Sequence, residues 1–228
     1  MHAAFRSFAS SLLFVALSGA CVTSGHVRAV KTADKLGDLR AAIEDMRDKV
    51  TASSTTLTTL LNQKDQDPTL AFQDFESAVN GLASAQRRAH TTLEGVKQQA
   101  EAYFTTWKEQ AATINDEDLK ERSEERREQL TTAVAQVSKA MEPVHEEVDT
   151  YLASLRDTLK YLSIDLSPQG IASIDGRAKA ASKSSKSVND QLSEALEVVD
   201  KTAPMFAKAR AAQPKKTSSS STDLTVPN

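Results

Sequence analysis

The feature that most constrains this chain is the spacing of its apolar residues, which recur every three or four positions through most of its length. The clearest run begins at Leu36 and ends at Leu60, with Ser53 as its one polar break. Its members are Leu36, Leu39, Ile43, Met46, Val50, Leu57 and Leu60. Residues at this spacing share one face of an α-helix, and so narrow a stripe favours packing against other helices.

Three further runs have the same spacing. They extend over residues 72–114, 130–162 and 171–206, and Gln86 and Gln110 are polar positions within the first of these. With only 7 glycines and 6 prolines in 228 residues, the chain has few turns. Short connections between long helices make neighbours antiparallel. The sequence therefore predicts an all-α fold, an elongated antiparallel four-helix bundle of coiled-coil-like rods.

A charged segment separates the second run from the third. Asn115 and Asp116 are good N-cap residues, so a helix is expected to begin there. From Asp116 to Gln129 nearly every residue is charged, and Leu119 is the one apolar exception. This composition predicts an exposed helical extension supported by Glu–Arg pairs three or four positions apart. The extension is also a candidate surface for self-association.

Two prolines predict features of the later helices. Pro143 lies inside the third run, where its missing N–H and its ring should kink the helix near Lys139. Pro168 follows Ser167, so these two residues are expected to be the first helical residue and the N-cap of the fourth helix.

The N-terminal segment has the order of an export signal. Arg6 precedes a mostly apolar run over residues 8–17, which is too short to span a bilayer, and the small residues 18–20 then lead to Cys21, the only cysteine. This order resembles a bacterial lipoprotein signal, in which the cysteine after the cut is acylated. The pattern departs from that signal at Ser18, because the usual leucine stands one place early at Leu17. Ordinary secretory cleavage after Ala20 is the alternative.

These observations divide the chain into three parts. We expect a lipoprotein-type signal peptide at residues 1–20, a helical bundle domain at residues 21–212, and a disordered C-terminal tail at residues 213–228, which is rich in serine and threonine. Residue 22 is Val and not Asp, which in lipoproteins of the common Gram-negative type implies sorting to the outer membrane. The expected location is therefore the periplasmic face of the outer membrane, with the chain anchored through Cys21.

The mature sequence carries no recognisable catalytic motif. No Gly-x-Ser-x-Gly elbow and no glycine-rich phosphate loop is present. Glu142, His145 and Asp149 have metal-ligand spacing, but a second Glu-x-x-His pair is missing, so a solvated helix face is the preferred interpretation. A net charge of −3 and isolated arginine pairs argue against nucleic acid as a partner. We expect no enzyme activity, metal, cofactor or small-molecule substrate.

One aromatic group is a candidate interaction site. Tyr103, Phe104 and Trp107 lie close together in the second run. An exposed aromatic cluster would mark a binding surface. Packing in a wider part of the bundle core is the alternative, and it is favoured because aromatic side chains bury large apolar areas.

The second half of the chain resembles a family of exported bacterial proteins, often lipoproteins, that is known only as a domain of unknown function. The resemblance covers roughly residues 30–205. Its most specific positions are Trp107, Leu119, Arg122, Ser123, Met141, Pro143, Val144, Asp149, Ile171 and Ile174. The sequence departs from the family after Asp149, where residues 155–159 read Leu-Arg-Asp-Thr-Leu. The resemblance implies a helical fold and brings no reaction, ligand or partner.

Together these patterns favour a non-enzymatic envelope lipoprotein that acts as a helical scaffold or interaction module. Its expected partners are the membrane, through the lipid anchor, and either another envelope protein or a second copy of itself. The alternative is a secreted periplasmic carrier or chaperone-like protein that binds apolar ligands or proteins between its helices, which the many small residues of the fourth run suggest.

Overall fold

The computed structural model describes residues 25–63 and 67–207, and all regular structure within these ranges is helical. The helices are α1 (Gly25–Asn62), α2 (Thr69–Ala111), α3 (Glu117–Ile164), α4 (Pro168–Ser173) and α5 (Asp175–Ala207). The all-α prediction is confirmed. The predicted signal peptide, Cys21 and the predicted tail from residue 213 lie outside the described residues.

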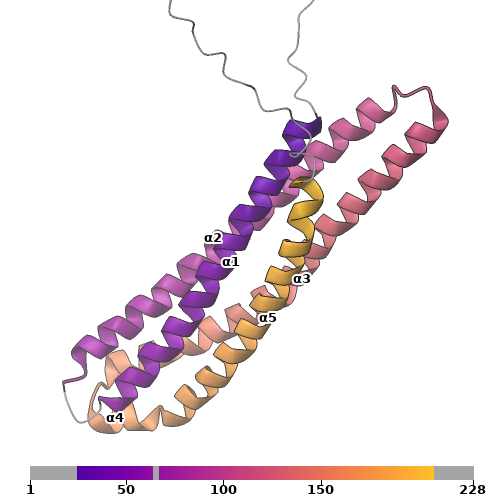
Figure 1. Cartoon of the computed structure of the whole chain (residues 1–228). Coiled ribbons are helices and arrows are strands. Elements are labelled where there is room, and N and C mark those ends of the chain that lie inside the picture. The colour runs from indigo at the N-terminus through magenta and orange to yellow at the C-terminus, as the bar shows by residue number, and fades with distance from the viewer. Residues whose placement is uncertain (1–24, 64–66, 208–228) are drawn as a thin grey trace, which may run out of the picture.

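The four long helices form an elongated antiparallel bundle (Figure 1). Helix α1 packs mainly against α2 and α5, and α3 packs against the same two helices from the other side. Apolar stripes on all four helices thereby meet along one central line. None of the helices in the described part of the chain is long and apolar enough to cross a membrane.

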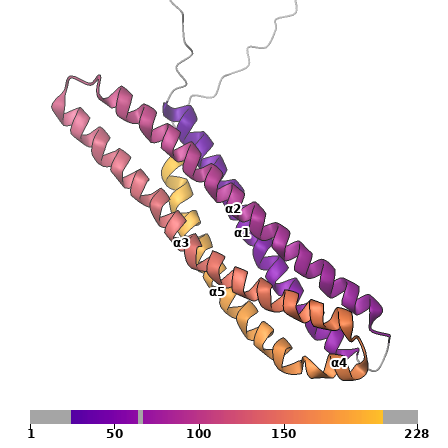
Figure 2. The same ribbon diagram turned by 180° about the vertical axis from the view of Figure 1, so that it is seen from behind.

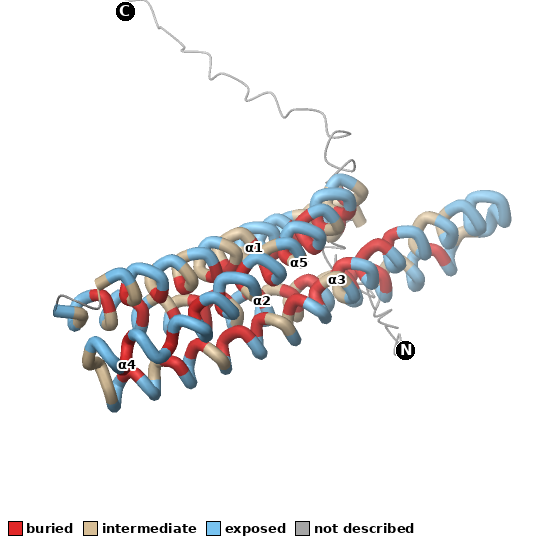
Figure 3. The backbone as a smooth tube through the Cα atoms, turned by 90° about the horizontal axis from the view of Figure 1, so that it is seen from below, coloured by how far each residue is buried: buried red, intermediate tan, exposed pale blue. Residues whose placement is uncertain are grey.

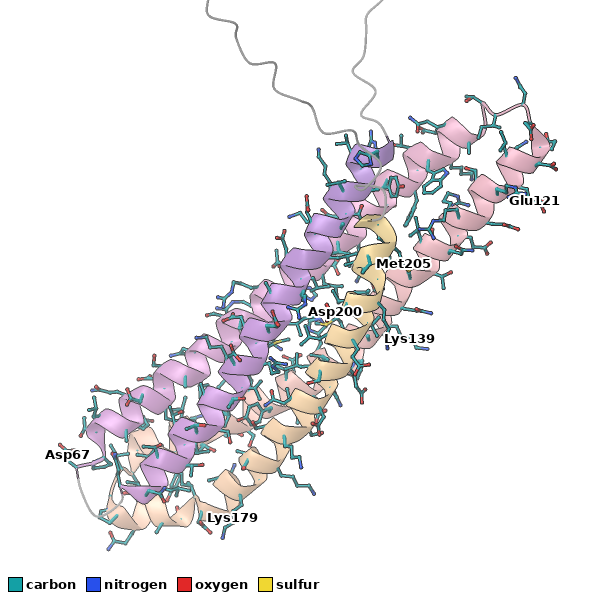
Figure 4. All side chains as sticks on the ribbon, viewed as in Figure 1. Asp67, Glu121, Lys139, Lys179, Asp200 and Met205 are labelled. Carbon is teal, nitrogen blue, oxygen red and sulfur yellow. The ribbon has the colours of Figure 1, made fainter. Side chains whose placement is uncertain are left out.

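The two ends of the bundle differ. At one end, which we call the hairpin end, α1 begins, α5 ends and residues 112–116 connect α2 to α3 (Figure 1). The α1–α2 connection and α4 lie at the opposite end. In Figure 4, Glu121 marks the hairpin end, and Asp67 and Lys179 mark the opposite end. The first and last described residues, Gly25 and Ala207, therefore lie at the same end of the molecule.

The core follows the predicted runs closely. All seven apolar members of the first run are buried, with 0–1% of their surface exposed, and they pack with buried residues of α2, α3 and α5. Most apolar residues of the second run are also buried. The exceptions are Phe72, Trp107 and Ile114, which are only partly buried, and its two glutamines are not buried either. In the third run, Thr158 takes the buried position and Leu159 is only partly buried.

The α2–α3 pair continues beyond the start of α1 and the end of α5. Residues 108–129, which we call the α2–α3 extension, are largely exposed (Figure 3). Asp116 caps α3 by accepting a hydrogen bond from the Leu119 N–H at 3.0 Å. The exposed helical extension predicted from Asp116 to Gln129 is confirmed, and the reason is local: two helices alone cannot enclose a core.

Helix α3 continues through Pro143 without a break. Figure 2 shows that its ribbon changes direction part-way along, so that α3 stays against α2 and α5 over a long distance. A proline inside a helix removes one backbone hydrogen bond and favours such a bend.

The predicted fourth helix is two helices. Ser167 accepts a hydrogen bond from the Gly170 N–H at 3.1 Å and Pro168 is the first helical residue, as predicted. The helix then stops at Ser173, and α5 starts at Asp175. The apolar spacing from Ile171 to Ile174 continues across this junction, so the sequence pattern gave no sign of the interruption.

Candidate functional site

The aromatic residues predicted as an interaction site lie at the hairpin end of the core. Tyr103 and Phe104 are only 6% and 9% exposed. Their rings lie 6.2 and 6.4 Å from the ring of Phe206, which is near the end of α5. Burial raises the pKa of the Tyr103 hydroxyl, and the Arg126 charge opposes that rise. These two residues therefore close the end of the bundle core and offer little surface to a protein partner.

Trp107, the only tryptophan, is more accessible. It is partly buried, and its ring centre lies 5.3 Å from that of Tyr103. Its Nε1–H donates a hydrogen bond of 2.8 Å to the Ser123 Oγ of α3. This contact joins the two helices at the base of the α2–α3 extension and fixes the orientation of the indole ring.

A cavity of about 250 Å³ lies beside Trp107. It is formed where α1 begins against α2 and α3, and it brings together residues far apart in the sequence. Its lining residues are Gly25, Arg28, Tyr103, Thr106, Trp107, Gln110, Ala111, Ile114 and Ser123. Sequence analysis identified the two aromatic residues but missed Arg28, because no motif links the start of α1 to this part of α2.

A second polar group lies at the α2–α3 contact further along the bundle. The rings of His90 and His145 meet edge to face, with their centres 5.3 Å apart. The Gln86 side chain donates a hydrogen bond of 2.7 Å to the Asp149 carboxylate, so this seam glutamine links α2 to α3. The Nε2 atom of His145 is buried and has no hydrogen-bond partner.

The surroundings of His145 favour its neutral form. Burial lowers the pKa of His145, and the His90 ring and the Lys97 charge act in the same direction. The carboxylates of Asp149 and Glu94 oppose that effect. Each histidine follows a buried residue of its helix, Ala89 or Val144, which was a usable sequence signal that both lie at the edge of an apolar stripe.

The residues considered as metal ligands do not converge. Glu142 is exposed, His145 faces His90, and Asp149 accepts its hydrogen bond from Gln86. Among the described residues, no group of three or more histidines, aspartates and glutamates is arranged to hold a metal ion.

The two arginine pairs in the sequence, at residues 87–88 and 126–127, make contacts within the bundle. Arg88 forms an ion pair with Asp45, and Arg127 with Glu124. Arg126 donates a hydrogen bond of 2.9 Å to the Met205 carbonyl oxygen, which ties the last turn of α5 to the base of the extension.

Comparison with known proteins places the chain by family only. A family model described as "Protein of unknown function (DUF2959)" matches residues 23–206, which confirms the predicted resemblance to a family of unknown function. A search of curated proteins found no match. The matched range includes Trp107 and every helix that forms the core.

Proposed function

The chain belongs to the DUF2959 family, whose function is unknown, and we propose that it is a non-enzymatic lipoprotein of the bacterial cell envelope that acts as a helical scaffold or interaction module. One observation carries the proposal. Cys21 precedes Gly25 by four residues, and Gly25 begins α1 at the hairpin end of the bundle.

An acyl anchor at Cys21 would hold the bundle by that end. Four extended residues span at most about 14 Å, so the hairpin end would remain close to the bilayer surface. Helix α3 has 48 residues and is about 72 Å long at about 1.5 Å each. The opposite end would then project far from the membrane, and the bundle would act as a spacer.

The anchor would be durable. One acyl chain gives only marginal, reversible binding, because each buried CH₂ contributes about 0.8 kcal/mol, and stable attachment takes two signals. The lipoprotein signal that the N-terminus resembles leads to more than one acyl chain on the cysteine. This supports permanent attachment, and Val22 after the cysteine supports the periplasmic face of the outer membrane as its place.

The α2–α3 extension is the surface that best fits a protein partner. It carries eight acidic and five basic side chains, and most of its residues are exposed, although α1 and α5 contact its base. Such a surface suits an envelope protein with complementary charge or a second copy of this chain.

Metabolic labelling with an alkynyl fatty acid tests the anchor. We expect label on the natural chain and on a Ser24→Ala variant, and none on Cys21→Ser, which should also leave the membrane fraction. An exported but unlabelled natural chain would overturn the anchored role and favour the alternative, a secreted carrier.

Photocrosslinking in living cells tests the partner surface. A photoreactive amino acid in place of Glu121, in the extension, should yield crosslinks to a protein or to another copy. The same amino acid in place of Lys179, near the opposite end, is the matched control. Crosslinks from position 179 alone would contradict the assignment of the extension as the partner surface.

A further inference from the structure

The cavity beside Trp107 has a charged donor without an acceptor. The Nε atom of Arg28 is buried and has no hydrogen-bond partner, and no ion pair or hydrogen bond of its guanidinium is found in the described part of the chain. A buried donor of this kind is unfavourable unless an acceptor reaches it. The natural acceptor for a guanidinium is a carboxylate or phosphate oxygen.

The rest of the cavity wall is largely apolar. Trp107 and Tyr103 form one side, and Ala111 and Ile114 extend it towards the α2–α3 connection. The Trp107 Nε1–H is already used by Ser123, so the indole offers the cavity mainly its ring surface. An apolar wall with one well-placed polar group is typical of small-ligand sites.

We propose that this cavity binds a small anionic amphiphile. Its carboxylate is held by the unpaired Arg28 guanidinium, and its hydrocarbon part lies against Trp107 and Tyr103. The volume of about 250 Å³ is at the small end for ligand sites, which favours a free medium-chain acid over a whole phospholipid. The proposal goes beyond the proposed function and does not depend on acylation of Cys21.

Because Trp107 is the only tryptophan, its fluorescence reports directly on the cavity. The experiment uses the chain from Val22 onward, which contains every described residue and lacks the anchor cysteine. Decanoate below its micelle concentration should produce a saturable change in Trp107 emission. Decanol, which has the same chain without the charge, should bind at least tenfold more weakly.

Arg28→Gln should weaken decanoate binding at least tenfold while leaving the helical circular dichroism and the melting temperature close to those of the natural chain. Lys31→Gln, which removes an exposed charge one turn further along α1, is the matched control and should bind like the natural chain. A folded Arg28→Gln protein with unchanged affinity would overturn the proposal.

Three other results would also overturn it. They are the absence of any saturable change with decanoate, equal binding of decanol and decanoate, and a response only to vesicles of anionic phospholipid. The last result would show that the charged donor meets a membrane surface and does not hold a free acid.

Discussion

Single polar residues inside the apolar seams have specific partners. Ser53, the one polar break in the first run, lies with its Oγ 3.1 Å from the Tyr151 hydroxyl of α3 and donates to the Val50 carbonyl oxygen at 2.8 Å. Both side chains are almost completely buried. The sequence showed a polar break at Ser53, but periodicity could not identify its partner, because that partner comes from a distant helix.

Removing one side of this buried pair should destabilise the bundle. Tyr151→Phe and Ser53→Ala should each cost about 1 kcal/mol of unfolding free energy, and the double variant should cost less than the sum. Urea unfolding followed by circular dichroism measures this. Tyr161→Phe removes a hydrogen bond of 2.8 Å from Ser173, but that bond is exposed, so stability should change by less than about 0.5 kcal/mol. Fully additive single effects would contradict the coupling between Ser53 and Tyr151.

His145 should make the bundle sensitive to acid. Its pKa is lower in the folded state than in the unfolded chain, so the unfolded state binds more protons as the pH falls. Stability is therefore full above the unfolded pKa of about 6.5 and declines below it. The loss should be modest, because the His145 side chain is only partly buried.

Thermal melts of the natural chain and of His145→Gln between pH 7.5 and 5.5 measure this contribution. The variant should lose less stability on acidification than the natural chain. His26→Gln is the control for a histidine at the start of α1. An identical pH dependence in the natural chain and in His145→Gln would contradict the role of burial at this site.

Among the helical elements, the α2–α3 extension should be the least stable. Its charged composition predicted its exposure, whereas its contact through Trp107 and Ser123 was not predicted, because hydrogen bonds between helices leave no periodic signal. Hydrogen exchange should show lower protection for the amides of residues 108–128 than for those of residues 36–60, since few buried contacts hold the extension.

Trp107→Phe should loosen the extension further. It removes the 2.8 Å hydrogen bond to Ser123, worth about 1 kcal/mol, which corresponds to roughly fivefold lower protection. Protection in residues 36–60 should not change. Equal loss of protection in both regions would mean that the extension opens only when the whole bundle unfolds.

Helix α4 requires a glycine at one position. A Cβ added at Gly170 would lie 2.3 Å from the Asp165 carbonyl oxygen, a backbone atom that cannot easily move. Gly170→Ala should therefore destabilise the bundle by about 1–3 kcal/mol. Gly37→Ala, within α1 and with nothing within 4 Å of the new Cβ, should instead stabilise it by up to about 1 kcal/mol. Denaturant unfolding compares the two variants. A Gly170→Ala variant with unchanged unfolding free energy would contradict the predicted clash with Asp165.

At the scale of the whole molecule, the sequence predicts the architecture better than the candidate site. Local spacing specifies which face of each helix is buried, and the residues of the first run all lie in the core as predicted. The cavity depends on where α1 begins relative to α2, which is a tertiary property. Arg28 and Trp107 are 79 positions apart, and nothing in their local sequences connects them.

The relative length of the helices also has a consequence for the whole molecule. Because α2 and α3 extend past α1 and α5, the extension lies at the same end as Gly25, where the proposed anchor attaches. An anchored molecule would therefore hold Trp107 near the bilayer. Ile164, which is 81% exposed at the far end of α3, would lie about 60 Å away along the helix.

Fluorescence quenching of the acylated protein in vesicles measures this arrangement directly, with nitroxide groups on the lipid headgroups as quenchers. The natural chain reports from Trp107, and the double variant Trp107→Phe, Ile164→Trp reports from the opposite end. The account predicts strong quenching of Trp107 and almost none at position 164. Equal quenching at both positions, or none at either, would contradict a rod held to the membrane by its hairpin end.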